Sequence, residues 1–257
     1  MGISAVLITY NEEANIDQCL KSLNFVDEIV VLDSFSSDRT IEIARQYTDK
    51  IRMREFTGFS DQKNASVALA TEEWVLVIDA DEVVTDELAA EIKRAVETGE
   101  FDYYSIPRLS YFLGRPIKHC GWYPDNVVRL VRRSKLRFPD RLVHESVIVD
   151  GKCGMLHSDL IHYSYRSMED FTRKMINYSR AAAQQKMSEG AGVSASDLFL
   201  RPWLIFLKKY ILKQGFRDGM HGLVLCVLTA CSSALRYAML WDMIARKAVT
   251  EEQTGGK

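Results

Sequence analysis

The sequence lacks several features that would assign it to a familiar class of protein. Its 257 residues carry a formal net charge of -2, so it has no surplus of basic charge with which to bind nucleic acid. It has five cysteines but no C-x-x-C pair, and the odd number argues against a disulfide framework or a structural zinc site. It also has no glycine-rich phosphate loop, which leaves little support for a kinase or a dinucleotide-binding enzyme.

Long apolar segments are also missing. The uncharged run over residues 222–235 has 14 residues, fewer than the ~20 that a helix needs to span a membrane. The N-terminus, MGISAVLITYNEE, has neither the basic start nor the long apolar core of a signal peptide. We therefore expect a cytoplasmic protein and disfavour a membrane-spanning helix.

The first part of the chain alternates between two kinds of segment. Short apolar runs at residues 3–8, 28–32, 51–54 and 74–78 are separated by segments with helical periodicity. This alternation predicts an α/β fold with a mainly parallel sheet. One helix carries clear start and stop signals, because Thr85 is a suitable N-cap and Gly99 a suitable end.

The pattern changes in the second part of the chain. Residues 102–150 contain short alternating runs such as VVRLVRR, which favour antiparallel strands added to the edge of the sheet. Helical patterns follow residue 167, and the polar end of the chain favours disorder. We therefore predict a domain over residues 1–166, a helical extension over 167–247 and a disordered tail over 248–257.

Three carboxylates follow one of the apolar runs directly, in WVLVIDADE at residues 74–82. The D-x-D spacing of Asp79 and Asp81 places both side chains on the same side of an extended backbone, so both can face one ligand. Carboxylate oxygens suit Mg²⁺ or Mn²⁺, which complete their shells with phosphate oxygens and water. The alternative is that DADE forms a helix-capping turn with solvated acids.

Polar and acidic side chains also follow the first two predicted strands, in TYNEE and in LDSFSSDRT. Open α/β sheets bind their ligands beyond the carboxyl ends of the strands. Three successive strand ends of this kind therefore predict one crevice with a shared function.

With these three motifs in order, the chain resembles the family 2 glycosyltransferases of the GT-A type. It is most similar to the subgroup of lipopolysaccharide-core β-glucosyltransferases, through GFSDQKNASVALA, GWYPDNVVRL, an H-E pair and GFRDG. The resemblance implies a GT-A fold, with a mixed, mainly parallel sheet, flanking helices and a C-terminal helical extension. It also implies that residues 1–107 bind a nucleotide sugar and that 108–166 form the acceptor side and close a metal site.

The resemblance implies roles for residues at the strand ends. Thr9, Tyr10 and Glu12 would hold the nucleoside, and Asp33 would accept a hydrogen bond from N3–H of uracil. Lys63 would approach the base or the diphosphate as a cation. The residues alone leave other interpretations open, since Asp33 could be an ordinary turn residue and Lys63 a solvated lysine.

By the same resemblance, Asp79 would contact the ribose and Asp81 would bind the divalent metal, Mg²⁺ or Mn²⁺. His162, in HSDLIHYSYRS, could close the metal site or touch the diphosphate. A lone histidine is more often a structural hydrogen-bonding residue.

Two carboxylates are candidates for the base that deprotonates the acceptor hydroxyl. Glu145 lies in RLVHES and Asp125 in GWYPDNVVRL. We favour Glu145, because alternation along LVHESVIV separates it from His144 and lets it emerge near the active edge of the sheet. The family's usual base lies in an E-D pair, and residues 108–166 contain none, so both residues stay open.

Three further residues are candidates for acceptor binding. Trp122 and Tyr123 have flat faces suited to sugar rings, but they could equally be core residues. Arg129 belongs to a basic cluster suited to an anionic acceptor, although solvated arginines are the alternative. The other members of the cluster are Arg132, Arg133 and Arg137.

The block over residues 198–247 combines apolar and aromatic residues with lysines and arginines. This composition suits a helix that lies on an anionic membrane surface. The alternative is packing against the catalytic domain or against another subunit of a homo-oligomer.

The sequence therefore predicts a metal-dependent, inverting glycosyltransferase. The expected reaction moves a hexose, with glucose preferred, from a UDP-sugar to a hydroxyl of a lipopolysaccharide-core or other cell-surface glycan. The alternatives are a protein, peptide or lipid-phosphate acceptor, or a non-catalytic, membrane-associated scaffold. A nucleotidyltransferase of the same fold is disfavoured because its G-x-G-x-R-rich loop is absent.

Overall fold

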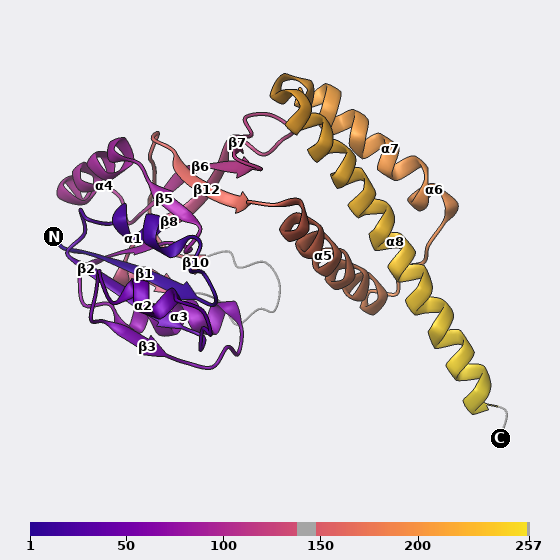
Figure 1. Ribbon diagram of the computed structural model, residues 1–257, viewed down its shortest axis with the longest axis horizontal. Helices are drawn as coiled ribbons and strands as arrows, with labels where there is room; N and C mark the ends of the chain where they lie inside the picture. The colour runs from indigo at the N-terminus through magenta and orange to yellow at the C-terminus, as the bar shows by residue number, and fades with distance from the viewer. Residues whose placement is uncertain (138–147, 256–257) are drawn as a thin grey trace. The chain divides into compact units, whose positions relative to one another are not determined.

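The computed structural model describes residues 1–137 and 148–255. The chain divides into two compact units. The first consists of Met1–Leu109 and Pro124–Tyr163, and the second of Ser110–Tyr123 and Ser164–Lys257 (Figure 1). The second unit thus takes a short segment from within the predicted domain over residues 1–166, in addition to the predicted helical extension.

Ten of the described strands form one sheet, in the order β3-β2-β1-β4-β8-β6-β12-β5, with β7 and β11 each paired to β6. Two more strands, β9 and β10, pair with each other. The strands are β1 (Ile3–Thr9), β2 (Glu28–Asp33), β3 (Ile51–Met53), β4 (Trp74–Val77), β5 (Glu82–Val84), β6 (Tyr103–Phe112), β7 (Arg115–Pro116), β8 (Asp125–Arg132), β9 (Leu136–Arg137), β10 (Ile148–Val149), β11 (Cys153–Met155) and β12 (Leu160–Tyr165).

The four predicted apolar runs form the parallel part of the sheet. Strand β1 pairs in parallel with both β2 and β4, and β2 pairs in parallel with β3. All four residues of β4 are buried, as are six of the seven in β1, which explains why these strands are apolar on both faces. The predicted α/β class is confirmed.

The antiparallel part begins at β8, which pairs with β4 on one side and with β6 on the other. At the far end of the strand order, β12 pairs in antiparallel fashion with β5, with His162 opposite Glu82. These pairings confirm that antiparallel strands extend the parallel sheet. They also bring residues after β4 beside residues of β8 and β12.

Short helices connect the strands of the first unit. Helix α4 begins as predicted, because the Thr85 hydroxyl accepts a hydrogen bond from the Leu88 amide at 3.2 Å. It ends at Gly99, whose φ of 59° is in the left-handed region that favours glycine. The helical segments are α1 (Ile16–Lys21), α2 (Thr40–Ala44), α3 (Phe59–Leu69), α4 (Asp86–Thr98) and the 3₁₀ turn η1 (Arg133–Lys135).

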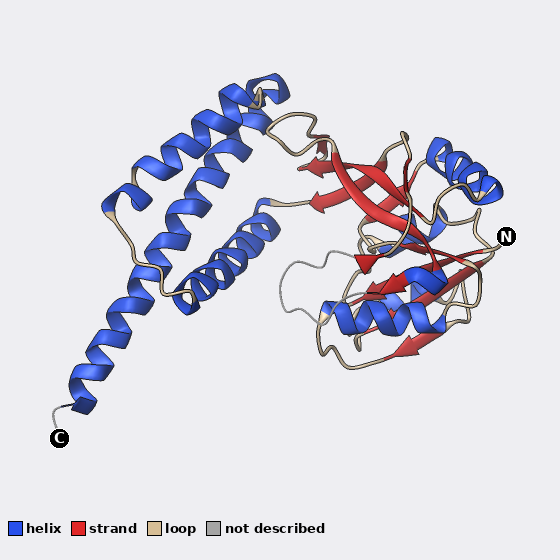
Figure 2. Ribbon diagram, turned by 180° about the vertical axis from the view of Figure 1, so that it is seen from behind, coloured by secondary structure: helices blue, strands red, loops and turns tan. Residues whose placement is uncertain are grey.

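The second unit is mainly helical. Helices α5 and α7 both pack along α8, and Figure 2 shows these long helices in blue. Apolar residues including Phe112, Ile117, Phe171 and Leu225 form its core. The segments are α5 (Met168–Ser188), α6 (Ala195–Leu198), α7 (Leu200–Leu207), the π-helical turn η2 (Lys208–Leu212), the 3₁₀ turn η3 (Gly215–Asp218) and α8 (Gly219–Gly255).

Helix α8 differs from the sequence-based expectation in two ways. It continues to Gly255, where the sequence predicted a disordered tail from residue 248. Among the described residues, the helical stretch Gly215–Lys247 is also long and apolar enough to cross a membrane, by length and composition alone. The sequence-based count stopped at the first charge, Arg236, whereas the helix continues beyond it.

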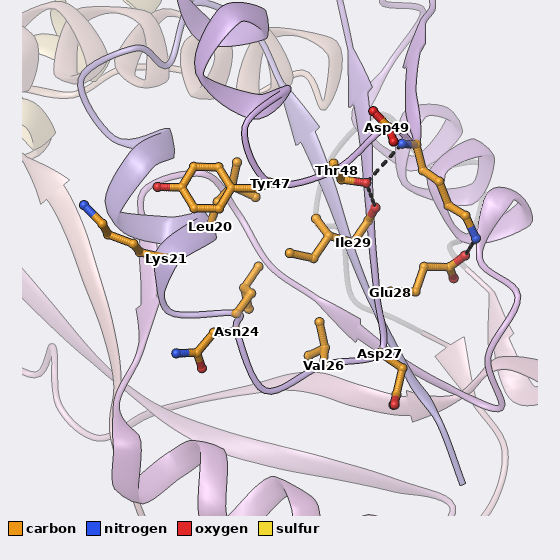
Figure 3. A pocket seen from close by; sticks show the side chains of 12 residues that line it. Leu20, Lys21, Asn24, Val26, Asp27, Glu28, Ile29, Tyr47, Thr48 and Asp49 are labelled. Carbon is orange, nitrogen blue, oxygen red and sulfur yellow. Dashed lines mark hydrogen bonds and ion pairs between the residues drawn. The ribbon is translucent and has the colours of Figure 1, made fainter.

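A hollow of about 600 Å³ lies near the start of β2, at the end of that strand remote from Asp33 (Figure 3). Glu28 lines it with a buried carboxylate that accepts hydrogen bonds from Lys50, from Ser4 and from the amide and hydroxyl of Thr71. Burial alone would raise the pKa of Glu28, but these hydrogen bonds outweigh it and lower the pKa to about 2.

We predict that Glu28→Gln destabilises the protein at neutral pH. Because the folded-state pKa of about 2 lies below the ordinary value of 4.5, the ionised carboxylate stabilises the fold above pH 4.5, and the effect is lost as the pH falls towards 2. The shift corresponds to at most about 3 kcal/mol at pH 7 and roughly half of that at pH 3. Urea unfolding at both pH values measures the difference.

The matched control is Glu42→Gln, which removes a carboxylate from an exposed ion pair with Arg39. It should change the free energy of unfolding little at either pH. Equal effects of the two substitutions would contradict the assigned role of Glu28.

Candidate active site

The carboxyl ends of β1 and β2 are joined through the carboxylate of Asp33. This side chain is fully buried and accepts hydrogen bonds from the Thr9 hydroxyl at 2.8 Å and from the Ser36 amide at 2.7 Å. The Ser36 hydroxyl also donates to it, at 2.5 Å. The structure therefore brings Thr9 and Asp33 together, but the Asp33 carboxylate accepts from Thr9 at the end of β1 and from Ser36 in its own loop, and it is closed to solvent.

The loop after β1 carries the other two predicted nucleoside residues. Tyr10 is exposed, and Asn11 has a φ of 54°, in the left-handed region. The amide of Glu12 donates to the Thr40 hydroxyl at 2.7 Å, and its carboxylate accepts from Asn15 at 2.6 Å. Glu12 thus fixes the turn into α1, while Tyr10 stays available to a ligand.

The D-A-D-E segment after β4 is held by buried cations. The guanidinium of Arg129, in β8, donates to both Asp79 and Glu82, and the Lys63 ammonium lies 3.5 Å from Asp79. Glu82 is fully buried, and its carboxylate also accepts from the Asp79 amide at 3.1 Å. The structure thus brings Lys63, Asp79 and Arg129 together from three different elements.

The charges decide the protonation state of Asp79. Burial alone would raise the pKa of this carboxyl, but Arg129 and Lys63 outweigh it and hold the pKa well below its ordinary value. The pKa of Arg129 shifts in the opposite direction. Burial alone would lower it, but the carboxylates of Asp79 and Glu82 outweigh burial and raise it. Asp79 is therefore ionised at neutral pH.

The ion-pair network continues to Asp125 through a residue that the sequence analysis did not select. Arg108, in β6, lies 3.3 Å from Glu82 and donates through two N–H groups to Asp125, at 2.6 and 3.0 Å. The sequence did carry a sign of this role, because Arg108 is the one charged residue in the mostly buried strand β6, and a charge in such a strand needs a partner. Glu82 was also given no role, although it completes the D-A-D-E motif.

Asp81 stands apart from this network. Its Oδ2 lies 3.3 Å from Nε2 of His162, and both side chains are partly exposed. The two residues come together because the chain runs through Asp81 into β5, and β5 pairs with β12. A carboxylate and an imidazole thus face each other beyond the end of β4, and their role in binding a metal stays a prediction.

This pair fits a divalent cation that also binds phosphate. Within residues 1–137 and 148–255, no three His, Cys, Asp or Glu side chains form a ready-made metal cluster. Mg²⁺ does not require one, because it is commonly held by one or two protein carboxylates together with substrate phosphates and water. Asp81 and His162 would hold such a cation, which would neutralise charge on a departing diphosphate when bound.

One prediction for the acceptor side needs correction. Arg129 is not a cation directed towards an acceptor, because it is buried and paired with Asp79 and Glu82. Trp122 is partly buried and packs against the core of the second unit, with its ring centroid 6.5 Å from that of Phe112 and 6.0 Å from that of Tyr165, so its contact with a sugar stays a prediction. Tyr123, also in the second unit, is partly buried.

Only one of the two candidates for the base, Asp125, lies within the described residues. Asp125 lies in β8, with one carboxylate oxygen occupied by Arg108. Glu145, the preferred candidate, lies outside the described residues, as does His144. The choice between them stays a prediction.

Residues 4–163 of the chain match the family described as glycosyl transferase family 2. The chain belongs to glycosyl transferase family 2. The matched range contains the three strand ends and every residue of the ion-pair network, so the site described above lies within the family's shared region. The prediction of the family is confirmed.

Curated relatives resemble the chain over nearly its whole length. The lipopolysaccharide core biosynthesis glycosyltransferase LpsC of Rhizobium meliloti is 29% identical over 263 residues, covering 96% of this chain and 95% of LpsC. An uncharacterised glycosyltransferase of Rickettsia felis is 30% identical over 261 residues, covering 95% of this chain and 91% of the relative.

A solved structure shows the same fold. The crystal structure of S. aureus TarS in complex with UDP-GlcNAc matches with a TM-score of 0.51 and 15% identity, over 96% of this chain and 92% of that chain. The predicted GT-A fold is confirmed. This member of family 2 is therefore a glycosyltransferase that uses a nucleotide-sugar donor.

We predict that Arg129→Met destabilises the protein by about 3 kcal/mol, because Asp79 and the buried Glu82 lose their shared partner and keep only Lys63 and Arg108, at 3.5 and 3.3 Å. Arg39→Met breaks an exposed ion pair with Glu42 and should cost less than about 1 kcal/mol. Chemical unfolding at neutral pH compares the two variants.

A triple variant separates loss of charge balance from loss of packing. Adding Asp79→Asn and Glu82→Gln to Arg129→Met removes all three charges and should recover a large part of the lost stability. If the triple variant is less stable than Arg129→Met alone, the charge-compensation argument is wrong.

Proposed function

We propose that this protein is a metal-dependent, inverting hexosyltransferase that takes glucose from UDP-glucose. The acceptor is a hydroxyl group of a lipopolysaccharide-core glycan or a related surface glycan. The observation that carries the proposal is the pairing of Asp81 with His162 at the end of β4, beside an Asp79 already neutralised by Lys63 and Arg129. In this proposal the Asp81 carboxylate binds the cation, and the Asp79 carboxylate contacts the nucleotide-sugar donor.

The charge distribution supports a diphosphate donor. Asp79, Glu82 and Asp125 are matched by Lys63, Arg129 and Arg108 within the network, so an anionic ligand does not meet a surplus of carboxylates there. A cation held by Asp81 and His162 would face the diphosphate. Asp79, fixed in position by its partners, would accept a hydrogen bond from a ribose hydroxyl.

Recognition of uracil by Asp33 requires a local rearrangement. Its Oδ2 accepts from the hydroxyl groups of Thr9 and Ser36, and hydroxyl rotors can turn to other acceptors. N3–H of uracil would then replace one of these donors. TarS, which shares the fold, binds UDP-GlcNAc, and this supports a uridine nucleotide as donor.

The acceptor is proposed from the relationship to LpsC, which is named for lipopolysaccharide core biosynthesis and matches the chain from end to end. Inversion follows if the acceptor hydroxyl attacks the anomeric carbon from the face opposite the departing UDP. We assign the base to Glu145, the candidate that the alternation along LVHESVIV favours, and keep Asp125 as the alternative. The hydroxyl proton would pass to Glu145 as the new glycosidic bond forms.

We predict that UDP with Mn²⁺ or Mg²⁺ raises the melting temperature and that a chelator removes the increase. The cation links Asp81 to the diphosphate, so UDP binding depends on it. Asp81→Asn should abolish the metal-dependent increase and leave the melting temperature without ligand nearly unchanged. Differential scanning fluorimetry measures both.

Asp86→Asn is the matched control, because Asp86 is an exposed carboxylate in the first turn of α4. It should respond to UDP and metal as the unaltered protein does. Equal stabilisation by UDP with metal and with chelator would contradict the proposed metal dependence.

We predict that Glu145→Gln retains UDP-glucose binding and loses transfer by ~10²-fold or more, the scale expected for a positioned base. Binding is measured calorimetrically, and transfer by release of UDP in the presence of a core-glycan acceptor. An active Glu145→Gln together with an inactive Asp125→Asn would assign the base to Asp125 instead.

A further inference from the structure

The segment formed by α7, η2 and η3 exposes an unusual amount of apolar surface. Seven large apolar side chains between residues 199 and 216 are 52–77% exposed. Isolated apolar residues are common on protein surfaces, whereas a contiguous group of this kind marks an interaction site. The seven are Phe199, Leu200, Trp203, Leu204, Ile211, Leu212 and Phe216.

The position of these residues on the helix explains why they are exposed. Phe206 and Tyr210 pack into the core of the second unit, and they define the inner face of this segment. Leu200, Leu204 and Ile211 recur at helical spacing on a different face. The segment is therefore apolar on both faces, and only one of them is covered.

An apolar groove of about 370 Å³ lies between α7 and α8. Phe199, Pro202 and Trp203 line one side, and Val227 and Ala234 belong to the other. The surface that lines the groove is almost entirely apolar, so the groove suits an acyl chain or an apolar side chain. It adjoins the exposed group through Phe199 and Trp203, which belong to both.

The exposed charges of this segment are positive. Residues 199–217 contain five Lys and Arg residues and no Asp or Glu, and the side chain of Asp218 at the end of η3 is 8% exposed and paired with His119. Lys208, Lys213 and Arg217 are exposed, and among the described residues none of the three forms an ion pair with a carboxylate. Exposed apolar side chains between cations are typical of surfaces that bind anionic lipid headgroups while their apolar groups enter the acyl region.

We propose that this face of the second unit, the exposed residues of 199–217 with the α7–α8 groove, docks on an anionic lipid bilayer. A second copy of the chain fits less well, because a two-fold interface over this face would place like charges opposite each other. A membrane supplies the opposite charge and covers the apolar group at the same time.

The contacts of α8 favour docking at the surface over spanning. Helix α5 packs along α8, with the Ser179 and Ser232 hydroxyl oxygens 3.0 Å apart and Ala183 buried beside Tyr237. Helix α5 also carries exposed charges such as Arg173 and Lys174. Inserting α8 across a bilayer would strip away this packing or draw the charges of α5 into hydrocarbon.

The docking surface adds to the proposed function and is independent of the donor site. It would keep the enzyme at the membrane face where a lipid-linked glycan acceptor lies. Vesicle binding requires neither UDP-sugar nor metal, so failure of docking and failure of the proposed transfer reaction can be told apart.

The test is co-sedimentation of the full chain with vesicles of phosphatidylcholine alone and of phosphatidylcholine with phosphatidylglycerol. We expect binding to the anionic vesicles that weakens as salt is raised. Lys208→Glu with Lys213→Glu should weaken this binding by roughly tenfold or more. Trp203→Ser with Leu204→Ser should weaken it at low and high salt alike, because apolar contacts are not screened.

The matched control is Tyr178→Ser, which removes an exposed aromatic side chain from α5. In Figure 1, α5 and α7 lie on opposite sides of α8. This variant should bind like the unaltered protein, and UDP with metal should stabilise all variants equally.

Three results would overturn the proposal. The first is a full chain that stays in the supernatant with anionic vesicles at low salt. The second is an oligomer, measured by light scattering, that Trp203→Ser with Leu204→Ser dissociates without any change in vesicle binding. The third is membrane-bound protein from cells that resists extraction at high salt and high pH, which would show a spanning helix.

Discussion

The buried guanidinium of Arg129 between Asp79 and Glu82 is the interaction on which the site depends. It joins β8 to the segment between β4 and β5, and through Arg108 the same network reaches Asp125. A strand covered on both faces can end in three carboxylates only if their charge is compensated, because unpaired buried charges are too costly to keep. The antiparallel strand that extends the parallel sheet supplies the compensating cation, so fold and site chemistry depend on one contact.

This compensation separates the two aspartates of the D-x-D pair. Asp79 is held by Lys63 and Arg129 and stays ionised, while Asp81 faces His162 outside the network. Two carboxylates of identical chemistry thus have different surroundings. In the proposed function, Asp79 is a fixed acceptor for a hydrogen bond, and Asp81 binds a cation shared with a diphosphate.

The two units differ in what their exposed surfaces offer. The first unit presents polar groups at the carboxyl ends of its parallel strands, as α/β sheets that bind nucleotides do. The second unit has a well-packed interior around Phe112 and Leu225, yet leaves the apolar and cationic face of residues 199–217 uncovered. The residues of this face make no part of that interior, and we propose that a partner covers them. The proposed partner is the surface that carries the glycan acceptor.

The sequence by itself determined the parallel strands, the cap at Thr85 and the three strand ends, because these depend on local patterns of apolar residues and turn-forming side chains. It also indicated the family, through motifs of contiguous residues. It could not determine the partners of Arg129, which lie 50 and 47 positions away along the chain and meet it only through the antiparallel register of β8. For the same reason it could not show that Trp122 contacts Phe112 and Tyr165. Pairing between distant strands decides which charges meet, and local pattern carries no record of it.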